Sequence, residues 1–220
     1  MEKTSMMLLF DLDGTLTCSH PGILLCVQRA LEEMGKPLPP QEEMRRFVGP
    51  PLGDSFRLLA GLSETECEEA VRRYRVHYEK EGALMNAPYE GIIPMLHRLR
   101  QEGLCLGVAT SKPSRFTGRI LDHFALTDLF DGVFCGDEDL HPLTKGQIIE
   151  KAMEAMGTMP SQTLMVGDTL FDARGAREAG VPFVGVLYGY GTRAEMEQEG
   201  ATVFARSVAE LQDALLEMAK

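Results

Sequence analysis

The stretch that decides the fold is Phe10-Asp11-Leu12-Asp13-Gly14-Thr15-Leu16, which follows an apolar run at residues 6–10. In an extended chain, residues i and i+2 point to the same side, so Asp11 and Asp13 project together while Leu12 points to the core. Two carboxylates about 4 Å apart repel each other by ~1–4 kcal/mol, depending on the effective dielectric. The pair therefore needs a cation, a shared proton or a wide separation. A D-x-D-G stretch by itself is also typical of surface turns and calcium loops.

A second acidic motif, V-G-D-T-L-F-D, occupies residues 166–172. Asp168 ends an apolar run, and Asp172 lies four residues later, on the same side of the helix that we expect to follow. The four acidic residues of the two motifs would then converge. Oxygen ligands without Cys or His favour Mg²⁺ over Zn²⁺, and Mg²⁺ typically keeps several waters. The two motifs together predict a magnesium site.

Two further elements can hold an anion. The segment V-A-T-S-K-P at residues 108–113 offers the Thr110 hydroxyl and backbone N–H groups at the start of a helix. Lys145, in L-T-K-G, precedes another helical pattern, and its ammonium group could hold a phosphate oxygen. Alone, Thr110 could merely cap a helix and Lys145 could be a solvated lysine.

The apolar runs alternate with helical patterns. Strands are expected at 6–10, 104–109, 133–135, 164–166 and 183–186, and helices at 92–102, 114–124, 147–156 and 169–179. This alternation predicts an α/β fold, a Rossmann-like three-layer α/β/α core with a mostly parallel sheet. Such sheets bind ligands at the carboxyl ends of their strands, where the polar motifs fall.

Residues 23–84 show no convincing strand. Helical patterns occupy 23–34, 41–47, 52–60 and 63–84, and the last begins with Ser63 and Glu66 at capping-box spacing. About sixty residues are too many for a loop in a compact domain, so a helical insertion is expected.

Composition limits the partners and the compartment. Of 220 residues, 33 are acidic and 22 basic, and the net charge of −11 argues against a nucleic acid polymer as partner. The five cysteines form no C-x-x-C pair, which predicts free thiols in the cytoplasm. The only N-terminal apolar run is five residues long and meets Asp11, so neither a signal peptide nor a membrane span is expected.

The ordered set of D-x-D-G-T, hydroxyl-rich strand end, lysine and G-D-x-x-x-D resembles the haloacid dehalogenase-like hydrolases over nearly the whole chain. This resemblance implies that Asp11 is the nucleophile that attacks phosphorus. It implies that Asp13 protonates the leaving alcohol and then activates water. A family member with dehalogenase activity would lack the second of these carboxylates.

The resemblance also assigns the ligands of the metal and of the phosphoryl group. Mg²⁺ would be held by the Asp11 and Asp168 side chains and the Asp13 backbone carbonyl, with Asp172 in support. The phosphoryl group would be clamped by Thr110, the N–H of Ser111 and Lys145.

The chain departs from the family pattern at two positions. Relatives often have Pro after the motif lysine, where this chain has Gly146, and an Asp where it has Cys18. Lys112 is the alternative phosphate ligand, although its place beside Pro113 favours a position on the surface.

The helical insertion resembles the small helical cap of one subclass of the family. It predicts a cap domain at residues 17–86 and a catalytic core at residues 1–16 and 87–220. Arg45 and the turn around Gly49 resemble the substrate loop of the phosphoglycolate-phosphatase and 5′-nucleotidase-like branches. His20 could reach the substrate or the hinge. A solvated helix face explains Arg45 equally well, and a lone histidine is more often structural.

The predicted function is a Mg²⁺-dependent phosphatase that acts through an aspartyl-phosphate on a small phosphorylated metabolite, a nucleoside 5′-monophosphate or phosphoglycolate type. A sugar phosphomutase of the β-phosphoglucomutase type shares every residue named here and stays open. From another class, a non-catalytic module that signals or binds through a phosphorylated Asp is the alternative. The sequence is compatible with a monomer or a dimer.

Overall fold

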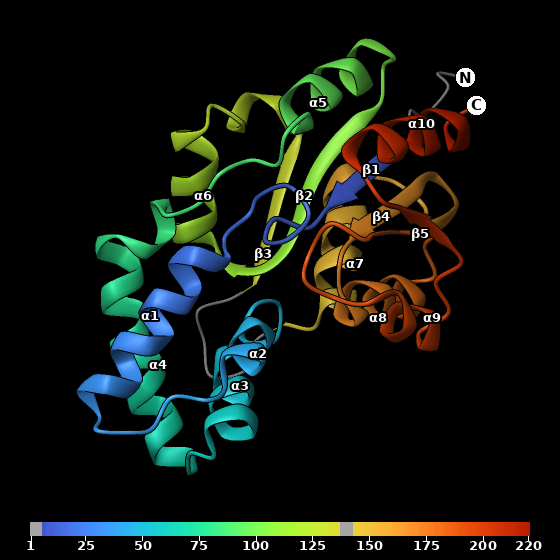
Figure 1. The fold of residues 1–220 in the computed structure, drawn as a ribbon. Coiled ribbons are helices and arrows are strands. Elements are labelled where there is room, and N and C mark those ends of the chain that lie inside the picture. Colours follow the sequence, from blue (N-terminus) through green and yellow to red (C-terminus); the bar gives the residue numbers. More distant parts are fainter. Residues whose placement is uncertain (1–5, 137–142) are drawn as a thin grey trace.

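The computed structural model describes residues 6–136 and 143–220. Its centre is a parallel sheet with the strand order β3-β2-β1-β4-β5-β6 (Figure 1). The strands are β1 (Met7–Phe10), β2 (Cys105–Pro113), β3 (Gly132–Gly136), β4 (Thr163–Gly167), β5 (Phe183–Val186) and β6 (Val203–Ala205). The predicted α/β class is confirmed.

Helices cover both faces of this sheet. The side chains of Leu8 and Phe10 in β1 pack among α5 (Ile92–Gln101), α6 (Ser114–His123) and α10 (Val208–Met218). Met7 and Leu9 point to the other face and pack among α7 (Lys145–Met156) and α8 (Leu170–Ala179). Because both faces are covered, a continuous apolar run such as 7–10 forms a central strand. The three-layer architecture is the predicted one.

The register of the central strands brings the two acidic motifs together. Phe10 pairs with Val166, so Asp11 and Asp168 leave neighbouring strands at the same end of the sheet. The chain order also reverses here, since β2 lies on one side of β1 and β4 on the other. Parallel sheets bind ligands at such a switch point.

The prediction of five strands was wrong by one. β6 adds an edge strand beside β5, pairing Val184 with Val203 and Val186 with Ala205. Its apolar run is only three residues long, between Thr202 and Arg206, and is too short to separate from a loop by pattern. Helix α9 (Arg193–Gln198) precedes this strand.

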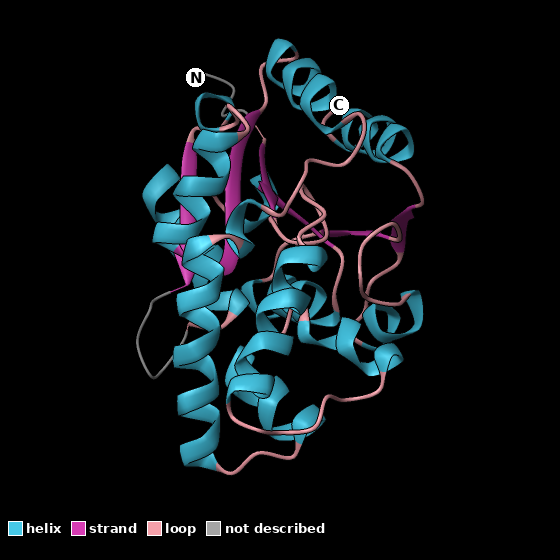
Figure 2. Cartoon of the chain, turned by 60° about the vertical axis from the view of Figure 1, so that its left-hand side comes forward, coloured by secondary structure: helices cyan, strands magenta, loops and turns pink. Residues whose placement is uncertain are grey.

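Residues 20–84 form a helical lobe beside the sheet (Figure 2). Its helices are α1 (His20–Glu33), α2 (Gln41–Met44), α3 (Leu52–Ala60) and α4 (Glu64–Lys80), with short 3₁₀ helices at Arg45–Phe47 and Gly82–Leu84. The predicted long helix at 63–84 divides near Gly82, where a Cβ would lie 2.4 Å from Cys26 Sγ, and a Cβ at Gly22 would lie 2.0 Å from the Gly82 carbonyl oxygen. The capping box of Ser63 and Glu66 is present.

The lobe has its own apolar cluster, which includes Phe47, Phe56, Tyr74 and Tyr78 and meets the sheet half at Phe116 of α6 and at Tyr190. Two segments connect the lobe to the sheet and lie side by side. The Cys18 N–H donates to the Ala87 carbonyl (2.7 Å), so the two connections form one paired hinge.

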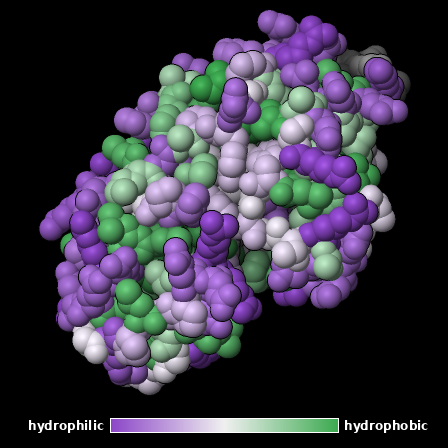
Figure 3. Space-filling model, viewed as in Figure 1, coloured by the Kyte–Doolittle hydropathy of each residue, from purple (hydrophilic) through white to green (hydrophobic). Residues whose placement is uncertain are grey.

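The surface between the lobe and the rest of the chain is hollowed. Figure 3 shows a notch between the lobe and the side of the sheet that carries α8 and α9, with hydrophilic and apolar residues interspersed on both sides. In the described residues, no helix is both long and apolar enough to span a membrane.

Candidate active site

Three buried carboxylates meet at the carboxyl ends of β1 and β4. Asp11, Asp168 and Asp172 are 6%, 0% and 1% exposed, and one oxygen of each lies within 4.8 Å of the others. Asp11 follows β1 and donates its N–H to the Val166 carbonyl at 2.9 Å. Burial raises the pKa of Asp11 to about 6, against the opposing effect of the Lys145 ammonium.

Asp168 is held by groups from two other segments. The backbone N–H of Tyr190 donates to its Oδ2 at 2.7 Å, and the Thr15 hydroxyl donates to its Oδ1 at 3.2 Å. Burial and the neighbouring carboxylates raise the pKa of Asp168. Gly14 has a φ of +89°, and a Cβ there would lie 2.2 Å from Asp168 Oδ2, so this turn requires glycine.

Asp172 caps the helix that carries it. Its Oδ2 accepts hydrogen bonds from the backbone N–H (3.0 Å) and hydroxyl (2.7 Å) of Thr169, which precedes α8. Its Oδ1 lies 2.8 Å from Lys145 Nζ. Asp172 therefore fixes the start of α8 and faces the acidic group at the same time.

Lys145 lies at the start of α7 and bridges the acidic residues. Its Nζ donates to Asp11 Oδ1 at 2.8 Å and to the Ala109 carbonyl at 3.0 Å. Burial alone would lower the pKa of this lysine, but the Asp11 and Asp172 carboxylates outweigh it, and the pKa is raised. The ammonium group is therefore charged within the site.

Gly146, the departure from the family pattern, lies where α7 packs closely against α8. A Cβ at Gly146 would lie 2.9 Å from Glu178 Oε2, and a Cβ at Gly175 would lie 2.7 Å from the Lys145 side chain. The two glycines thus let α7 and α8 approach closely, which brings Lys145 to the carboxylates.

The expectation of a surface position for Lys112 was wrong. Its side chain is only 7% exposed, and its Nζ lies 2.6 Å from Asp13 Oδ2. Strand β2 continues to Pro113, with a register shift against β3 between Thr110 and Pro113. Such an irregularity changes the direction of side chains, which explains why Lys112 enters the site.

Thr110 and Ser111 lie at the same irregular strand end. Thr110 is 2% exposed, and its hydroxyl accepts a hydrogen bond from the Lys112 N–H at 3.3 Å. Ser111 is half-buried. The helix that follows begins at Ser114, as predicted, so Thr110 and Ser111 offer groups of a strand end rather than of a helix terminus.

The charges of the site fit a divalent cation. The site gathers the carboxylates of Asp11, Asp13, Asp168 and Asp172, whereas its ammonium groups are those of Lys112 and Lys145. Fully ionised, these six groups leave two negative charges. The buried ligand atoms are all oxygens, the set that Mg²⁺ prefers. Asp11 and Asp168 would hold the ion, with Asp172 beside them.

The predicted substrate residues of the lobe lie around the hinge and the loop before α3. His20 starts α1, its backbone N–H donates to the Tyr190 hydroxyl (3.1 Å), and its ring lies 3.3 Å from Cys18 Sγ. Burial and then the charge of Arg45 lower the pKa of His20. Arg45 itself is exposed.

Gly49 brings the lobe to the edge of the acidic site. Its φ is +105°, and a Cβ would lie 3.1 Å from Thr169 Cγ2, next to Asp168. The loop that contains Gly49 therefore covers the start of α8.

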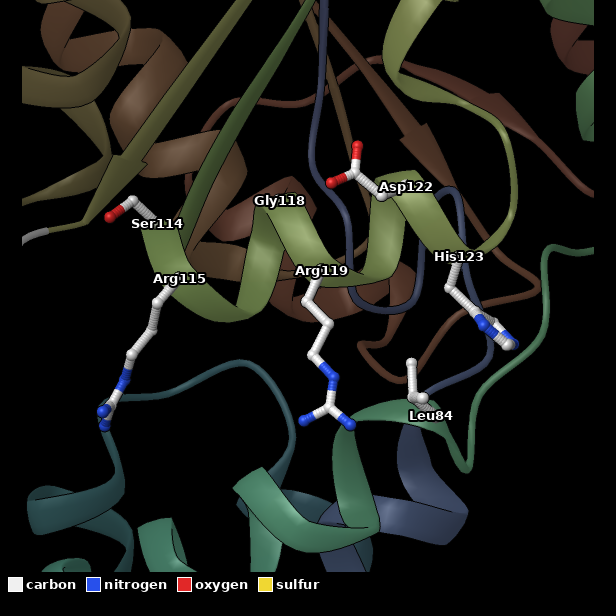
Figure 4. A pocket seen from close by; sticks show the side chains of 7 residues that line it. All are labelled: Leu84, Ser114, Arg115, Gly118, Arg119, Asp122 and His123. Atoms are coloured by element: carbon white, nitrogen blue, oxygen red, sulfur yellow. The ribbon is translucent and has the colours of Figure 1, made fainter.

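Lobe and sheet also meet at a groove along α6, of about 620 Å³ (Figure 4). There Arg119 of α6 donates to the carbonyl of Glu79 in α4. None of the predicted site residues line this groove, which is formed by Leu84, Ser114, Arg115, Gly118, Arg119, Asp122 and His123.

Sequence reasoning misplaced one group that contacts the acidic residues and missed two others. Lys112 was assigned to the surface, and Thr15 and the Tyr190 backbone received no role, although the T of D-x-D-G-T and the Y-G-Y-G loop after the last predicted strand were visible signals. Hydrogen bonds between distant loops depend on packing, which motif spacing does not describe.

Comparison with known proteins identifies the family. The family model described as haloacid dehalogenase-like hydrolase matches residues 8–186. A 5′-nucleotidase of Pseudomonas aeruginosa is 35% identical over 208 residues, which cover 94% of each protein. A protein named tyrosine-protein kinase PtkA from Mycobacterium tuberculosis is 35% identical over 215 residues, covering 97% of this chain and 73% of that protein.

A crystal structure of "a predicted phosphatase" from Clostridium acetobutylicum has a TM-score of 0.92 and 36% identity, covering 97% of this chain and 99% of that one. Family model, relatives and structure thus agree along nearly the whole length, and the resemblance drawn from the motifs is confirmed. The chain belongs to the haloacid dehalogenase-like hydrolases and is an enzyme of the phosphatase kind within that family.

Proposed function

We propose that this chain is a Mg²⁺-dependent phosphatase for a small phosphate monoester, with a nucleoside 5′-monophosphate or phosphoglycolate as the substrate type. The observation that carries the proposal is the buried group of Asp11, Asp168 and Asp172 with Lys145 at its centre. When bound, Mg²⁺ would neutralise charge on the phosphoryl oxygens.

In the first step the Asp11 carboxylate attacks phosphorus. The bond from phosphorus to the ester oxygen breaks, and that oxygen takes a proton from Asp13 as the alcohol leaves. Lys145, 2.8 Å from Asp11, and the hydroxyl group of Thr110 stabilise the charge on the transferring phosphoryl group.

In the second step water attacks the aspartyl-phosphate. Asp13 takes the proton of the water, the bond from phosphorus to Asp11 breaks, and phosphate is released. Both side chains return to their starting protonation states, so the cycle is balanced. Asp13 serves as acid first and as base afterwards.

The lobe would act as a cap over this site. The boundaries proposed for it, residues 17–86, fall in the hinge where Cys18 pairs with Ala87. A closed cap excludes water, and its loop around Gly49 would contact the leaving group beside Thr169. Substrate choice then depends on this loop and on Arg45.

The test is a screen for phosphate release with Mg²⁺ over nucleoside monophosphates, phosphoglycolate, sugar phosphates and pyrophosphate. We expect release from one class of monoester well above the others. A hexose 1-phosphate that rearranges without net release would favour the phosphomutase, and no turnover of any ester would contradict the phosphatase.

An Asp13→Asn variant tests the intermediate. It keeps the side-chain shape but cannot activate water, so a phospho-enzyme, detected as added mass, should accumulate after mixing with substrate. An inactive variant with no added mass would leave the first step as the blocked one, and one with full turnover would remove Asp13 from the chemistry.

A further inference from the structure

The Asp13 carboxylate is held at one oxygen only. Its Oδ2 accepts a hydrogen bond from Lys112 Nζ at 2.6 Å, and its side chain is 13% exposed. Its Oδ1 is buried and has no hydrogen-bond partner among the described residues. The terminal torsion of an aspartate is soft, so the side chain alone does not fix which oxygen faces the site. A hydrogen-bond partner on Oδ2 fixes which oxygen faces the site.

Lys112 is itself held from both halves of the molecule. The irregularity of β2 between Thr110 and Pro113 directs it from the sheet. On the other side its Nζ lies 4.8 Å from the centre of the Tyr78 ring, which belongs to α4 of the lobe and is 1% exposed. Tyr78 is in turn stacked on Tyr74 at 5.2 Å. The position of Lys112 therefore depends on contact between lobe and sheet.

The two buried lysines serve different carboxylates. Lys145 contacts Asp11 and Asp172, whereas Lys112 contacts Asp13. We propose that Lys112 is a positioning residue, which holds Oδ2 of Asp13 and so presents Oδ1 to the ester oxygen and later to water. This inference rests on the phosphatase chemistry proposed above and adds a residue to it.

The test depends on the leaving group, because an alkyl alcohol needs a proton to leave and an aryl group such as p-nitrophenolate does not. Lys112→Met should lower kcat/KM for adenosine 5′-monophosphate about 100-fold, the usual loss when general acid catalysis fails. For p-nitrophenyl phosphate the loss in kcat/KM should stay below about five-fold, since kcat/KM reports formation of the phospho-enzyme, the step in which this leaving group needs no proton. Equal losses for the two esters would overturn the proposal.

Three variants control this comparison. Lys112→Arg should restore most of the adenosine 5′-monophosphate activity, because a guanidinium group can also donate to Asp13. Lys80→Met, at an exposed lysine of α4, should behave as wild type. In an Asp13→Asn background, Lys112→Met should cause no further loss, because two residues that act as one unit are not additive. Independent losses would mean that Lys112 acts elsewhere.

A crystal structure of Lys112→Met gives a readout that does not need turnover. We expect the Asp13 carboxylate to leave its present orientation, and an unchanged Asp13 in a folded variant would overturn the inference. Wild-type protein that releases phosphate from neither ester would reject the proposed function instead, while the orientation of Asp13 would still decide the role of Lys112.

Discussion

The carboxyl end of the sheet and the helical lobe use charged residues in opposite ways. At the carboxyl end of the sheet, Lys145 and Asp11 are paired at 2.8 Å with side chains 5% and 9% exposed. In the lobe, Arg57 and Asp54 are paired at 2.6 Å with side chains 53% and 50% exposed. Exposed pairs contribute about 0–1 kcal/mol, whereas loss of one partner of a buried pair costs about 3–5 kcal/mol. The buried charges lie where the proposed chemistry would need them.

The two regions also differ in what fixes their residues. Asp11 and Asp168 follow directly from neighbouring strands in register, so backbone topology brings them together. Arg45 begins a three-residue 3₁₀ helix and Gly49 lies in the loop that follows it, where only packing decides their direction. The proposed reaction would therefore depend on the sheet, and the proposed choice of substrate would depend on the lobe.

The largest effect is expected for Asp11→Asn, which should lower phosphate release by about 10⁴-fold or more, because no nucleophile remains. The fold should persist, since the amide keeps the shape of the carboxylate. Phosphate release and circular dichroism measure the two properties. Asp54→Asn, at the exposed pair of the lobe, is the matched control and should change neither. Retained turnover in Asp11→Asn would exclude it as the nucleophile.

Removal of divalent metal should abolish activity nearly as completely, since two negative charges would remain uncompensated beside the phosphate. Added Mg²⁺ should restore activity and raise the melting temperature, because the ion binds only the folded site. Activity assays and thermal unfolding with EDTA, then with Mg²⁺, check both. Full activity in EDTA would show that the acidic site at the carboxyl ends of β1 and β4 does not need a metal ion and in this respect does not differ from the lobe.

Sequence patterns predicted the parts of the site that depend on strand ends. The apolar runs before Asp11 and Asp168 are long enough to mark central strands, and parallel strands place their carboxyl ends at one edge. The buried position of Lys112 was not predicted, because its direction depends on an irregularity in β2 that no local pattern marks. The edge strand β6 was missed because a three-residue run carries too little signal.

A core substitution in the lobe should have a smaller and more local effect. Phe56 is fully buried and packs against Phe47, with ring centres 5.4 Å apart. Phe56→Ala should cost about 3–5 kcal/mol of stability. Amide exchange should accelerate in α1 and α4 while β1 stays protected, if the two regions open separately. Leu58→Ala, 74% exposed on the same helix, is the control. If the amides of β1 lost protection from exchange to the same extent, the lobe and the sheet would unfold as one cooperative unit.

The smallest expected effect concerns the hinge, where the lobe meets the sheet through His20. Around its ring lie the Cys18 sulfur at 3.3 Å, the Tyr190 ring at 5.8 Å and the charge of Arg45. Burial and then the charge of Arg45 lower the pKa of His20 below the ordinary histidine value of 6.5. The unfolded chain therefore takes up a proton more readily, and stability is lost as the pH falls from 6.5 through the lower folded value.

Urea unfolding at about pH 7.5 and about pH 5.5 measures this loss. It should be smaller in His20→Gln, and also in Arg45→Gln, because that change removes one of the two causes of the shift. His97→Gln, at an exposed histidine of α5, should leave it as in wild type. A loss that persists unchanged in Arg45→Gln would mean that the charge of the lobe loop does not reach the hinge. The lobe residues proposed to face the substrate could then vary without altering how the lobe is joined to the sheet.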